Sequence, residues 1–415
     1  MASVLVTHIL IPLVSFIAEF NYVINPYFEI YLFAIMNNPM NVAIDCRPLQ
    51  EDSSLGRGIG SYLINLLENW PEANQLRPVF MNNKPIPDLP VLKRFTPLLY
   101  KPTWMIWRIA TDFSQFLSQN GVELFHFSGQ YNVTPLAIPY TVTVHDIMYF
   151  PLRKLEIEQA TSFWKRLEWT LDLWWMTRRG KKELGQAAGL IAVSQFTKDD
   201  LFQHLAIPLE HTTVVYNGID TDFINAAPPT TSDVLEKHQI PPRYILTVAP
   251  FETRKNLGNM IKACLALQED IPFVIVTKDH PAPSLELQTL IDANPKRIRL
   301  ITDLPKADLV ALYQEATVFL FATNYEGFGL PVLEAMAVGT PVITSTTTSL
   351  PEVAGDAAVL VDPSDTGAIT SALSTLLSDE SLRASLIKKG LERVNEFSYQ
   401  KAAEETLTFF SRHIA

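Results

Sequence analysis

Two glutamates, Glu326 and Glu334, stand in the segment ATNYEGFGLPVLEAMAVGTPV with seven residues between them. A short apolar run precedes them, and Gly327, Gly329 and Pro331 lie between the two carboxylates. Because proline suits the start of a helix, we expect Glu326 in a loop and Glu334 in the first helical turn. The free N–H groups of a helix start bind anions, and carboxylates accept hydrogen bonds from vicinal hydroxyls. The pattern therefore favours a ligand that carries both phosphate and sugar, such as a nucleotide sugar.

Two other interpretations of this pair remain open. Glu334 could merely favour the dipole of its helix, with Glu326 a solvated loop residue. The two carboxylates could instead be the acid and the base of a glycoside hydrolase. The hydrolase interpretation leaves a nearby pair of basic residues unexplained.

That basic pair is Arg254 and Lys255 in APFETRKNLGNM, between a predicted strand and a helix. Two fixed cations could neutralise the two negative charges of a diphosphate leaving group. The ordinary alternative is a solvated basic pair at a loop tip. We favour the diphosphate role because this pair and the glycine loop follow strands of the same predicted sheet.

The first half of the chain offers weaker candidates. Gly58 and Gly60 lie in LGRGIGSYL, a GxGxG turn before a predicted helix. It lacks a complete dinucleotide fingerprint, but its backbone could approach a phosphate or a hexose. His145 ends the strand YTVTV and could hold the donor sugar, although a lone histidine at a strand end is more often structural. Asp146 and Ser194 also directly follow predicted strands.

The elements that must position these residues are strands alternating with helices. Apolar strands such as NVAIDC, GLIAV, RYILTV and ATVFLFAT are each followed by a loop and a helical pattern. This alternation predicts an α/β protein with parallel sheets covered on both faces. The linker FINAAPPTTSD divides the chain into an expected first domain, residues 40–225, and a second, residues 226–397. Since ligands bind at the carboxyl ends of such strands, two facing sheets would gather the candidates around one cleft.

Composition sets the outer bounds. The chain has 415 residues, enough for two domains, and a net charge of −11, which opposes nucleic-acid binding. Cys46 and Cys264 have no metal-ligand spacing, so we expect a reducing, cytoplasmic compartment. Residues 1–39 are apolar, but charged and amide residues interrupt them. We expect them to be translated upstream of a true start at Met40; the alternative is a re-entrant or peripheral membrane segment.

The stretch FWKRLEWTLDLWWMTRRGKKEL combines aromatic and basic residues. Four tryptophans precede four cations: Trp164, Trp169, Trp174, Trp175, Arg178, Arg179, Lys181 and Lys182. Such a helix suits the surface of an anionic membrane, where a lipid-linked acceptor would be met. The alternative is a helix whose tryptophans pack onto its own domain.

Together these segments resemble the family 4 retaining glycosyltransferases of GT-B fold. The resemblance covers about residues 40–415 and is carried by EGFGLPVLEAMAVGTPVI, FETRKNL, VSQFTKDDL, VVYNGID, VHDIMYFP and GRGIGSYLINLL. It implies two Rossmann-like domains facing across a cleft. It also implies that the final segment, residues 398–415, is a helix that crosses back to the first domain.

The resemblance further implies roles for the candidate residues. Glu326 would contact hydroxyls of the donor hexose, and Glu334 the ribose. Arg254 and Lys255 would hold the diphosphate, and His145 would lie beside the transferred sugar. The backbone amides from the glycine loop would face the sugar and the diphosphate; this loop comprises Gly327, Phe328, Gly329 and Leu330. Such enzymes need neither metal nor cofactor, and they retain the anomeric configuration without a protein nucleophile.

The motif style is closest to mannosyl- and rhamnosyltransferases of polysaccharide synthesis, which suggests GDP-mannose as donor and a glycan or lipid-linked acceptor. VIVTKDHPAP departs from the family pattern, because it lacks the glycine-rich turn that many members have after this strand. This leaves the nucleotide open. The alternatives are a catalytically inactive GT-B scaffold or binding protein and a sugar-nucleotide epimerase. A phosphorylase would need pyridoxal phosphate and a matching lysine, and a solute-binding protein would need an export signal; the sequence shows neither.

Overall fold

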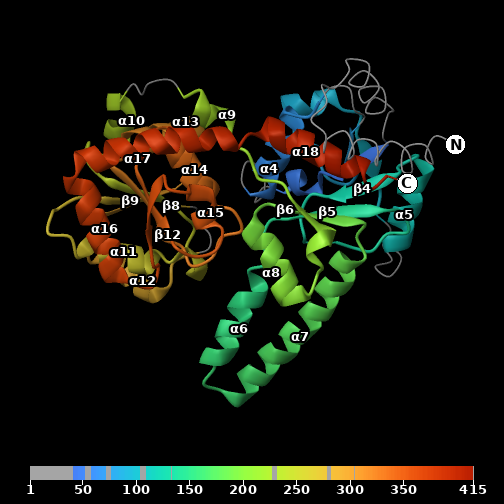
Figure 1. Ribbon diagram of the computed structural model, residues 1–415, viewed down its shortest axis with the longest axis horizontal. Helices are drawn as coiled ribbons and strands as arrows, with labels where there is room; N and C mark the ends of the chain where they lie inside the picture. The colour runs from blue at the N-terminus through green and yellow to red at the C-terminus, as the bar shows by residue number, and fades with distance from the viewer. Residues whose placement is uncertain are drawn as a thin grey trace, which may run out of the picture.

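The computed structural model describes residues 41–51, 58–71, 76–102, 109–131, 133–226, 231–277, 282–302 and 304–414. The expectations for residues 1–39 lie outside these ranges. Two α/β lobes stand side by side, and a pair of helices projects from the first lobe (Figure 1). Among the described helices, none combines the length and the apolar character needed to cross a bilayer.

The first lobe contains one parallel sheet. Its strands are β1 (Val42–Asp45), β2 (Leu76–Met81), β3 (Leu98–Tyr100), β4 (Leu124–Phe127), β5 (Tyr140–Val144), β6 (Gly189–Ala192) and β7 (Thr212–Val214). They lie in the order β3-β2-β1-β4-β5-β6-β7. All five residues of β5 are buried, because helices cover both faces of the sheet.

The helices of this lobe follow the strand ends. They are α4 (Ile59–Glu68), α5 (Ile109–Gln119), α6 (Tyr149–Gln159), α7 (Phe163–Gly185) and α8 (Gln195–Leu205), with 3-10 turns η2 (Arg47–Gln50), η3 (Pro90–Arg94) and η5 (Leu209–His211). The short helix α9 (Thr221–Ile224) packs on the second lobe, where Phe223 joins the core and contacts Tyr313. Ser194 caps α8, since its Oγ accepts a hydrogen bond from Thr197 N.

The second lobe repeats the same topology. Its strands are β8 (Ile245–Val248), β9 (Phe273–Thr277), β10 (Ile298–Thr302), β11 (Val318–Phe321), β12 (Val342–Ser345) and β13 (Ala358–Val361). Their order is β10-β9-β8-β11-β12-β13, again all parallel. In both sheets the strand order reverses beside the first strand, between β1 and β4 and between β8 and β11. Ligands of such sheets bind at this point of reversal.

The remaining helices complete the second lobe and return to the first. They are α10 (Thr231–Lys237), α11 (Leu257–Leu265), α12 (Leu285–Asp292), α13 (Lys306–Glu315), α14 (Leu330–Ala337), α15 (Leu350–Ala354), α16 (Thr366–Ser378), α17 (Glu380–Arg393) and α18 (Tyr399–Ser411), with 3-10 turns η6 (Thr253–Lys255) and η7 (Val394–Glu396). The helix α18 lies beside α4 (Figure 1). It buries Tyr399, Leu407 and Phe410 in the core of the first lobe. The expected fold, with a C-terminal helix crossing back, is confirmed.

The chain passes between the lobes twice, and the two passes touch. Ile219 N donates to Phe397 O at 3.1 Å, and Ile219 forms an isolated parallel bridge with Ser398. A Cβ atom added to Gly218 would lie 2.1 Å from Tyr399 N. A side chain would collide there, so the close contact between the two passages requires glycine at position 218.

Candidate functional site

The basic pair and Glu326 come from adjacent strands of the second sheet. Arg254 and Lys255 lie in η6, which follows β8, and Glu326 lies in the loop after β11. The strands β8 and β11 are neighbours at the reversal of strand order. Asn324 N donates to Arg254 O at 2.8 Å and ties the two loops together. Sheet topology therefore brings together residues that are 71 positions apart in the chain.

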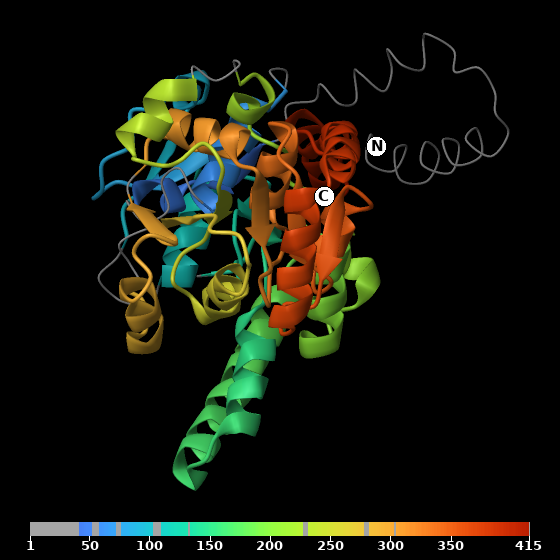
Figure 2. The same ribbon diagram turned by 90° about the vertical axis from the view of Figure 1, so that its left-hand side faces the viewer.

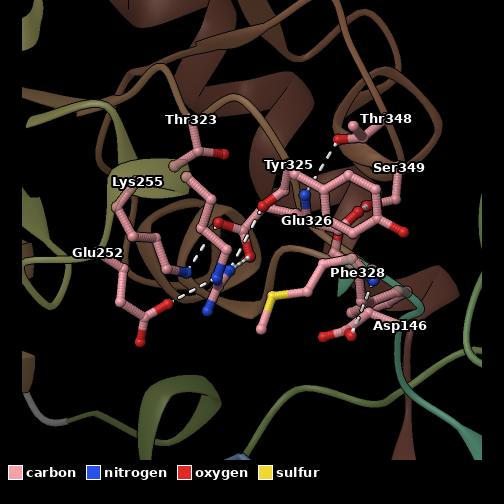
Figure 3. Close-up of polar contacts among 12 residues, drawn as sticks. Asp146, Glu252, Lys255, Thr323, Tyr325, Glu326, Phe328, Thr348 and Ser349 are labelled. Carbon is pink, nitrogen blue, oxygen red and sulfur yellow. Dashed lines mark hydrogen bonds and ion pairs between the residues drawn. The ribbon is translucent and has the colours of Figure 1, made fainter. Parts of the chain in front are cut away.

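These three side chains form a compact charged cluster, in which Figure 3 labels Lys255 and Glu326. Lys255 Nζ lies 2.8 Å from Glu326 Oε1, and Arg254 Nη1 lies 3.2 Å from Glu326 Oε2. Lys255 is 8% exposed and Glu326 is 7% exposed. Charges this deeply buried need partners, so each side chain holds the others in place. The cations thus have fixed positions before any ligand arrives.

Glu252 completes the surroundings of Arg254, whose Nε lies 2.6 Å from Glu252 Oε2. Burial works against the charge of the guanidinium. The carboxylates of Glu326 and Glu252 outweigh that effect and hold the pKa of Arg254 above its usual value. Thr323, close to this cluster in Figure 3, has a buried Oγ1 without a hydrogen-bond partner among the described residues.

The loop after β12 supports the backbone at Glu326. Glu326 N donates to Thr348 Oγ1 at 3.3 Å. Ser349 Oγ lies 2.9 Å from the carbonyl oxygen of Glu326 and 2.8 Å from that of Phe328. Gly329 has φ 111°, and a Cβ there would lie 2.6 Å from Leu350 Cδ2. This geometry requires glycine immediately before α14.

Phe328 and Leu330 pack into the core of the second lobe. Phe328 is 5% exposed and contacts the rings of Tyr216 and Phe397. Leu330 is partly buried against the same core. Their side chains thus anchor the loop, and the predicted role of their backbone toward a ligand stays a prediction.

Gly327 touches the first lobe. A Cβ on Gly327 would lie 1.8 Å from His145 O, so the two main chains are in direct contact. The carbonyl oxygen of Gly327 accepts a hydrogen bond from Ser194 Oγ at 2.7 Å and lies 3.1 Å from Thr197 Oγ1. The two lobes can therefore come this close only with glycine at position 327. This requirement is separate from access of a ligand to the loop.

The ring of His145 faces its own lobe. His145 Nε2 lies 2.8 Å from Ser128 O, and the ring stands edge-on to Tyr62 with centroids 4.9 Å apart. Burial lowers the pKa of His145 to about 4, although the bond to Ser128 acts in the opposite direction. At neutral pH the imidazole is uncharged. The structure thus brings the main chain of His145 to the glycine loop and holds its ring beside α4.

The glycine turn of the first lobe lies at the start of α4. Gly58 precedes the helix with φ 52°, which favours glycine, and Gly60 is buried in its first turn. Tyr62, one turn along, is the residue that contacts His145. This helix start therefore lies on the His145 side of the molecule, and no contact in the described ranges joins Gly58 or Gly60 to the charged cluster.

Asp146, which the sequence marks only by its position after a strand, follows β5 and receives no role from the sequence. It is half-buried, and Figure 3 shows its carboxylate beneath Phe328. Burial raises the pKa of Asp146, Arg254 lowers it and Glu326 raises it, so the carboxylate is in electrostatic contact with the cluster. Tyr131 Oη lies 3.5 Å from Asp146 Oδ1. The first lobe thus adds a third carboxylate opposite the cations.

Glu334 has different neighbours. It is half-buried on α14, and its Oε2 accepts a hydrogen bond from Tyr313 Oη at 2.8 Å. Burial raises the pKa of Glu334 to about 7, and this hydrogen bond acts against the rise. Among the described residues, no contact joins Glu334 to Glu326. The two glutamates therefore have different partners: Glu334 has Tyr313, and Glu326 has Arg254 and Lys255.

Further contacts close the lobes over this region. Glu352 accepts hydrogen bonds from Gln195 N at 2.7 Å and Phe196 N at 3.1 Å, at the start of α8. Tyr325 Oη donates to Asp200 Oδ2 at 2.5 Å. Among the described residues, no group of three or more His, Cys, Asp or Glu could hold a metal ion.

Comparison with known proteins agrees with this fold and these motifs. The family model described as Glycosyltransferase Family 4 matches residues 56–223, and the model described as Glycosyl transferases group 1 matches residues 233–393. Among solved structures, the Anabaena protein HepE in complex with UDP and glucose superimposes with a TM-score of 0.69. That comparison has 15% identity and covers 90% of this chain and 100% of HepE. The architecture is that of the GT-B glycosyltransferases.

Curated relatives carry more specific names. The chain is 29% identical over 242 residues to O-antigen chain mannosyltransferase B of Escherichia coli, covering 57% of this chain and 64% of that protein. It is 27% identical over 294 residues to the MMP alpha-(1->4)-mannosyltransferase of Mycolicibacterium hassiacum, covering 69% of each. The chain spans less than two thirds of the first of these relatives. It belongs to the family 4 glycosyltransferases.

Proposed function

We propose that this protein is a metal-independent retaining glycosyltransferase. In this proposal it moves a hexose, mannose from GDP-mannose, to a glycan or a lipid-linked acceptor in polysaccharide synthesis. The observation that carries the proposal is the buried cluster of Arg254, Lys255 and Glu326 at the strand reversal of the second sheet. Mannose as the sugar is supported by the names of the relatives, which are mannosyltransferases.

The cluster suits a donor that carries a diphosphate and a sugar. The diphosphate brings two negative charges to Arg254 and Lys255, and preorganised cations stabilise charge that develops on a leaving group. Glu326 then exchanges part of its contact with the cations for hydrogen bonds from hexose hydroxyls. In this proposal Glu334 accepts from the ribose. The backbone at Gly58 and Gly60 approaches the donor in this proposal, and His145 lies beside the transferred sugar.

The reaction that we propose proceeds on one face of the sugar. The acceptor oxygen forms a bond to the anomeric carbon as the bond from that carbon to the diphosphate oxygen breaks. The leaving phosphate oxygen takes the acceptor's proton, and the configuration is retained. In the free protein both carboxylate oxygens of Glu326 contact cations, and in this proposal the side chain binds hydroxyls and does not attack the sugar.

The compartment follows from the same proposal. We place the enzyme in the cytoplasm, at the inner face of a membrane where a lipid-linked acceptor is present. Support comes from Cys46 and Cys264, which are both free and buried.

Calorimetric titration with GDP, UDP, dTDP and ADP, each in the presence of EDTA, tests the donor site. We expect selective binding of one nucleotide, lost in Arg254→Ala. Transfer from the matching sugar nucleotide should then be abolished in Glu326→Ala and in Lys255→Ala, with the fold intact by circular dichroism. Full turnover in either variant would overturn the mechanism.

The same experiment separates the alternatives. An inactive scaffold would bind no nucleotide, or would bind without turnover in the wild type. An epimerase would convert the sugar nucleotide without an acceptor. The anomeric configuration of the product, followed by NMR, decides whether the enzyme retains or inverts.

A further inference from the structure

The helices α6 and α7 form a hairpin that stands away from both lobes (Figures 1 and 2). The 23 residues of α7 make a helix about 35 Å long. Near the lobe the hairpin is anchored, since Leu173 and Met176 pack against the core. The two helices are joined to each other by Arg153 of α6, which lies 3.3 Å from Asp172 of α7. Away from the lobe its surface is largely exposed.

One face of α7 carries large apolar side chains in contact with solvent. We name these residues the α7 stripe: Phe163, Trp164, Leu167, Leu171, Trp174 and Trp175. Their exposed fractions run from 40% for Leu167 to 74% for Trp164. From Trp164 onward their spacing of three or four residues places them on one side of the helix, opposite Leu173 and Met176. Six large apolar side chains exposed together on one helix face mark an interaction site.

The same face ends in cations toward the lobe. Arg178 and Lys182 continue the spacing of the α7 stripe, and Arg179 and Lys181 flank it; all four are exposed. Arg178 lies over the ring of Trp174 at 4.6 Å, and Arg179 over Trp175 at 5.5 Å. Residues 149–185 contain eight Lys and Arg against five Asp and Glu, a net charge of +3 in a chain of −11. The hairpin is a basic, aromatic projection on an acidic protein.

We propose that the α7 stripe docks onto the surface of an anionic lipid bilayer, with the tryptophans at the headgroup level and the cations on the lipid phosphates. Charge favours this occupant over a second copy of the chain, because two hairpins facing each other would bring like charges together. Aromatic and basic residues on one face are what an interfacial helix needs.

The hairpin also follows directly from the candidate site. The helix α6 begins at Tyr149, four residues after His145. A bilayer bound by α7 would therefore lie on the side of the first lobe from which α6 and α7 project after β5. This relation to a lipid-linked acceptor rests on the proposed function, whereas docking itself does not.

Flotation with vesicles tests the proposal on the full chain without donor. We expect binding to phosphatidylcholine vesicles that contain phosphatidylglycerol, no binding to phosphatidylcholine alone, and release by salt. The triple variant Trp164→Ser, Trp174→Ser, Trp175→Ser should bind at least about tenfold more weakly. The variant Arg178→Gln, Lys181→Gln, Lys182→Gln should lose about a hundredfold. Leu285→Ser, which removes a leucine that is 86% exposed on α12, should bind like the wild type.

Three outcomes would overturn the proposal. The first is that the wild type does not bind vesicles at low salt. The second is that the tryptophan variant binds as well as the wild type. The third is that light scattering shows a dimer for the wild type and a monomer for the tryptophan variant. The last would make a second copy the occupant. Thermal unfolding of the variants should match the wild type, since the altered side chains are exposed. Transfer to a water-soluble acceptor is measured separately, so failure of the proposed function and failure of docking give different results.

Discussion

Lys255 Nζ and Glu326 Oε1 are 2.8 Å apart, and both residues are more than nine-tenths buried. A buried ion pair of this kind is costly to break, because removing one partner leaves the other charge uncompensated. Its position at the strand reversal means that the pair orders the side chains of the site, and that loss of one partner would destabilise the lobe.

The first prediction concerns this pair. Lys255→Met should lower the free energy of unfolding by about 3 kcal/mol, since Glu326 would keep only its longer contact with Arg254. The double variant Lys255→Met, Glu326→Leu should be less destabilised than the sum of the single changes. Chemical denaturation of the four proteins measures the coupling, and strict additivity would contradict the buried pair.

The second prediction concerns pH and Glu334. Burial raises the pKa of Glu334 to about 7, so the carboxyl is partly protonated in the free protein at neutral pH. Ribose hydroxyls donate to the ionised form, so binding should release a proton. Affinity for the sugar nucleotide should therefore rise with pH and level off above about pH 7. Calorimetry with an intact sugar nucleotide, whose diphosphate does not titrate there, should show this rise in the wild type and a flat profile in Glu334→Gln.

The same shift affects stability. A carboxyl whose pKa is raised from 4.5 to about 7 on folding binds its proton more tightly in the folded state. Its contribution to the free energy of unfolding therefore falls as pH rises between these two values. Glu334→Gln should remove this slope, and an unchanged slope would show that Glu334 is not its source.

The third prediction concerns the contact between the lobes. Gly327→Ala places a methyl group where His145 O now lies, so the lobes must separate. We expect a larger radius of gyration in small-angle X-ray scattering and a loss of transfer of about a hundredfold, because the lobes would no longer align their groups. Gly258→Ala is the matched control: nothing lies within 4 Å of the added Cβ on α11. A Gly327→Ala protein with wild-type dimensions and activity would contradict the contact.

The fourth prediction concerns Asp146. Its carboxylate belongs to the first lobe and is in electrostatic contact with Arg254 and Glu326, and we predict that it serves the acceptor. Asp146→Asn should lower transfer by about tenfold, the weight of one hydrogen bond to a charged group, while nucleotide affinity changes little. Calorimetry and transfer assays separate the two effects. Equal losses in both would assign Asp146 to the donor instead.

Much of the fold could be predicted from local pattern. Short apolar runs such as YTVTV are buried on both faces, and each is followed by a polar loop, which is the signature of parallel sheets. The rule that ligands lie at strand ends selected Arg254, Lys255 and Glu326 from the sequence, and the structure brings them into contact.

The contacts themselves could not be predicted from local pattern. Pairing of Lys255 with Glu326 depends on β8 and β11 being neighbours, which strand periodicity does not determine. The partner of Glu334, Tyr313, lies on α13, and nothing in the spacing of residues points to it. Gly327 was predicted for access to a ligand, yet its closest constraint is the main chain of His145, in another lobe.

The crossing of the two interdomain passages at Gly218 and Tyr399 has a mechanical consequence. Because both passages are joined at one point, we expect the lobes to pivot there, so that opening would be a rotation rather than a translation. Such a rotation would need changes in backbone torsions near Gly218 and Ser398. The rate of opening, and with it the release of product, can therefore be altered at a position that touches no ligand.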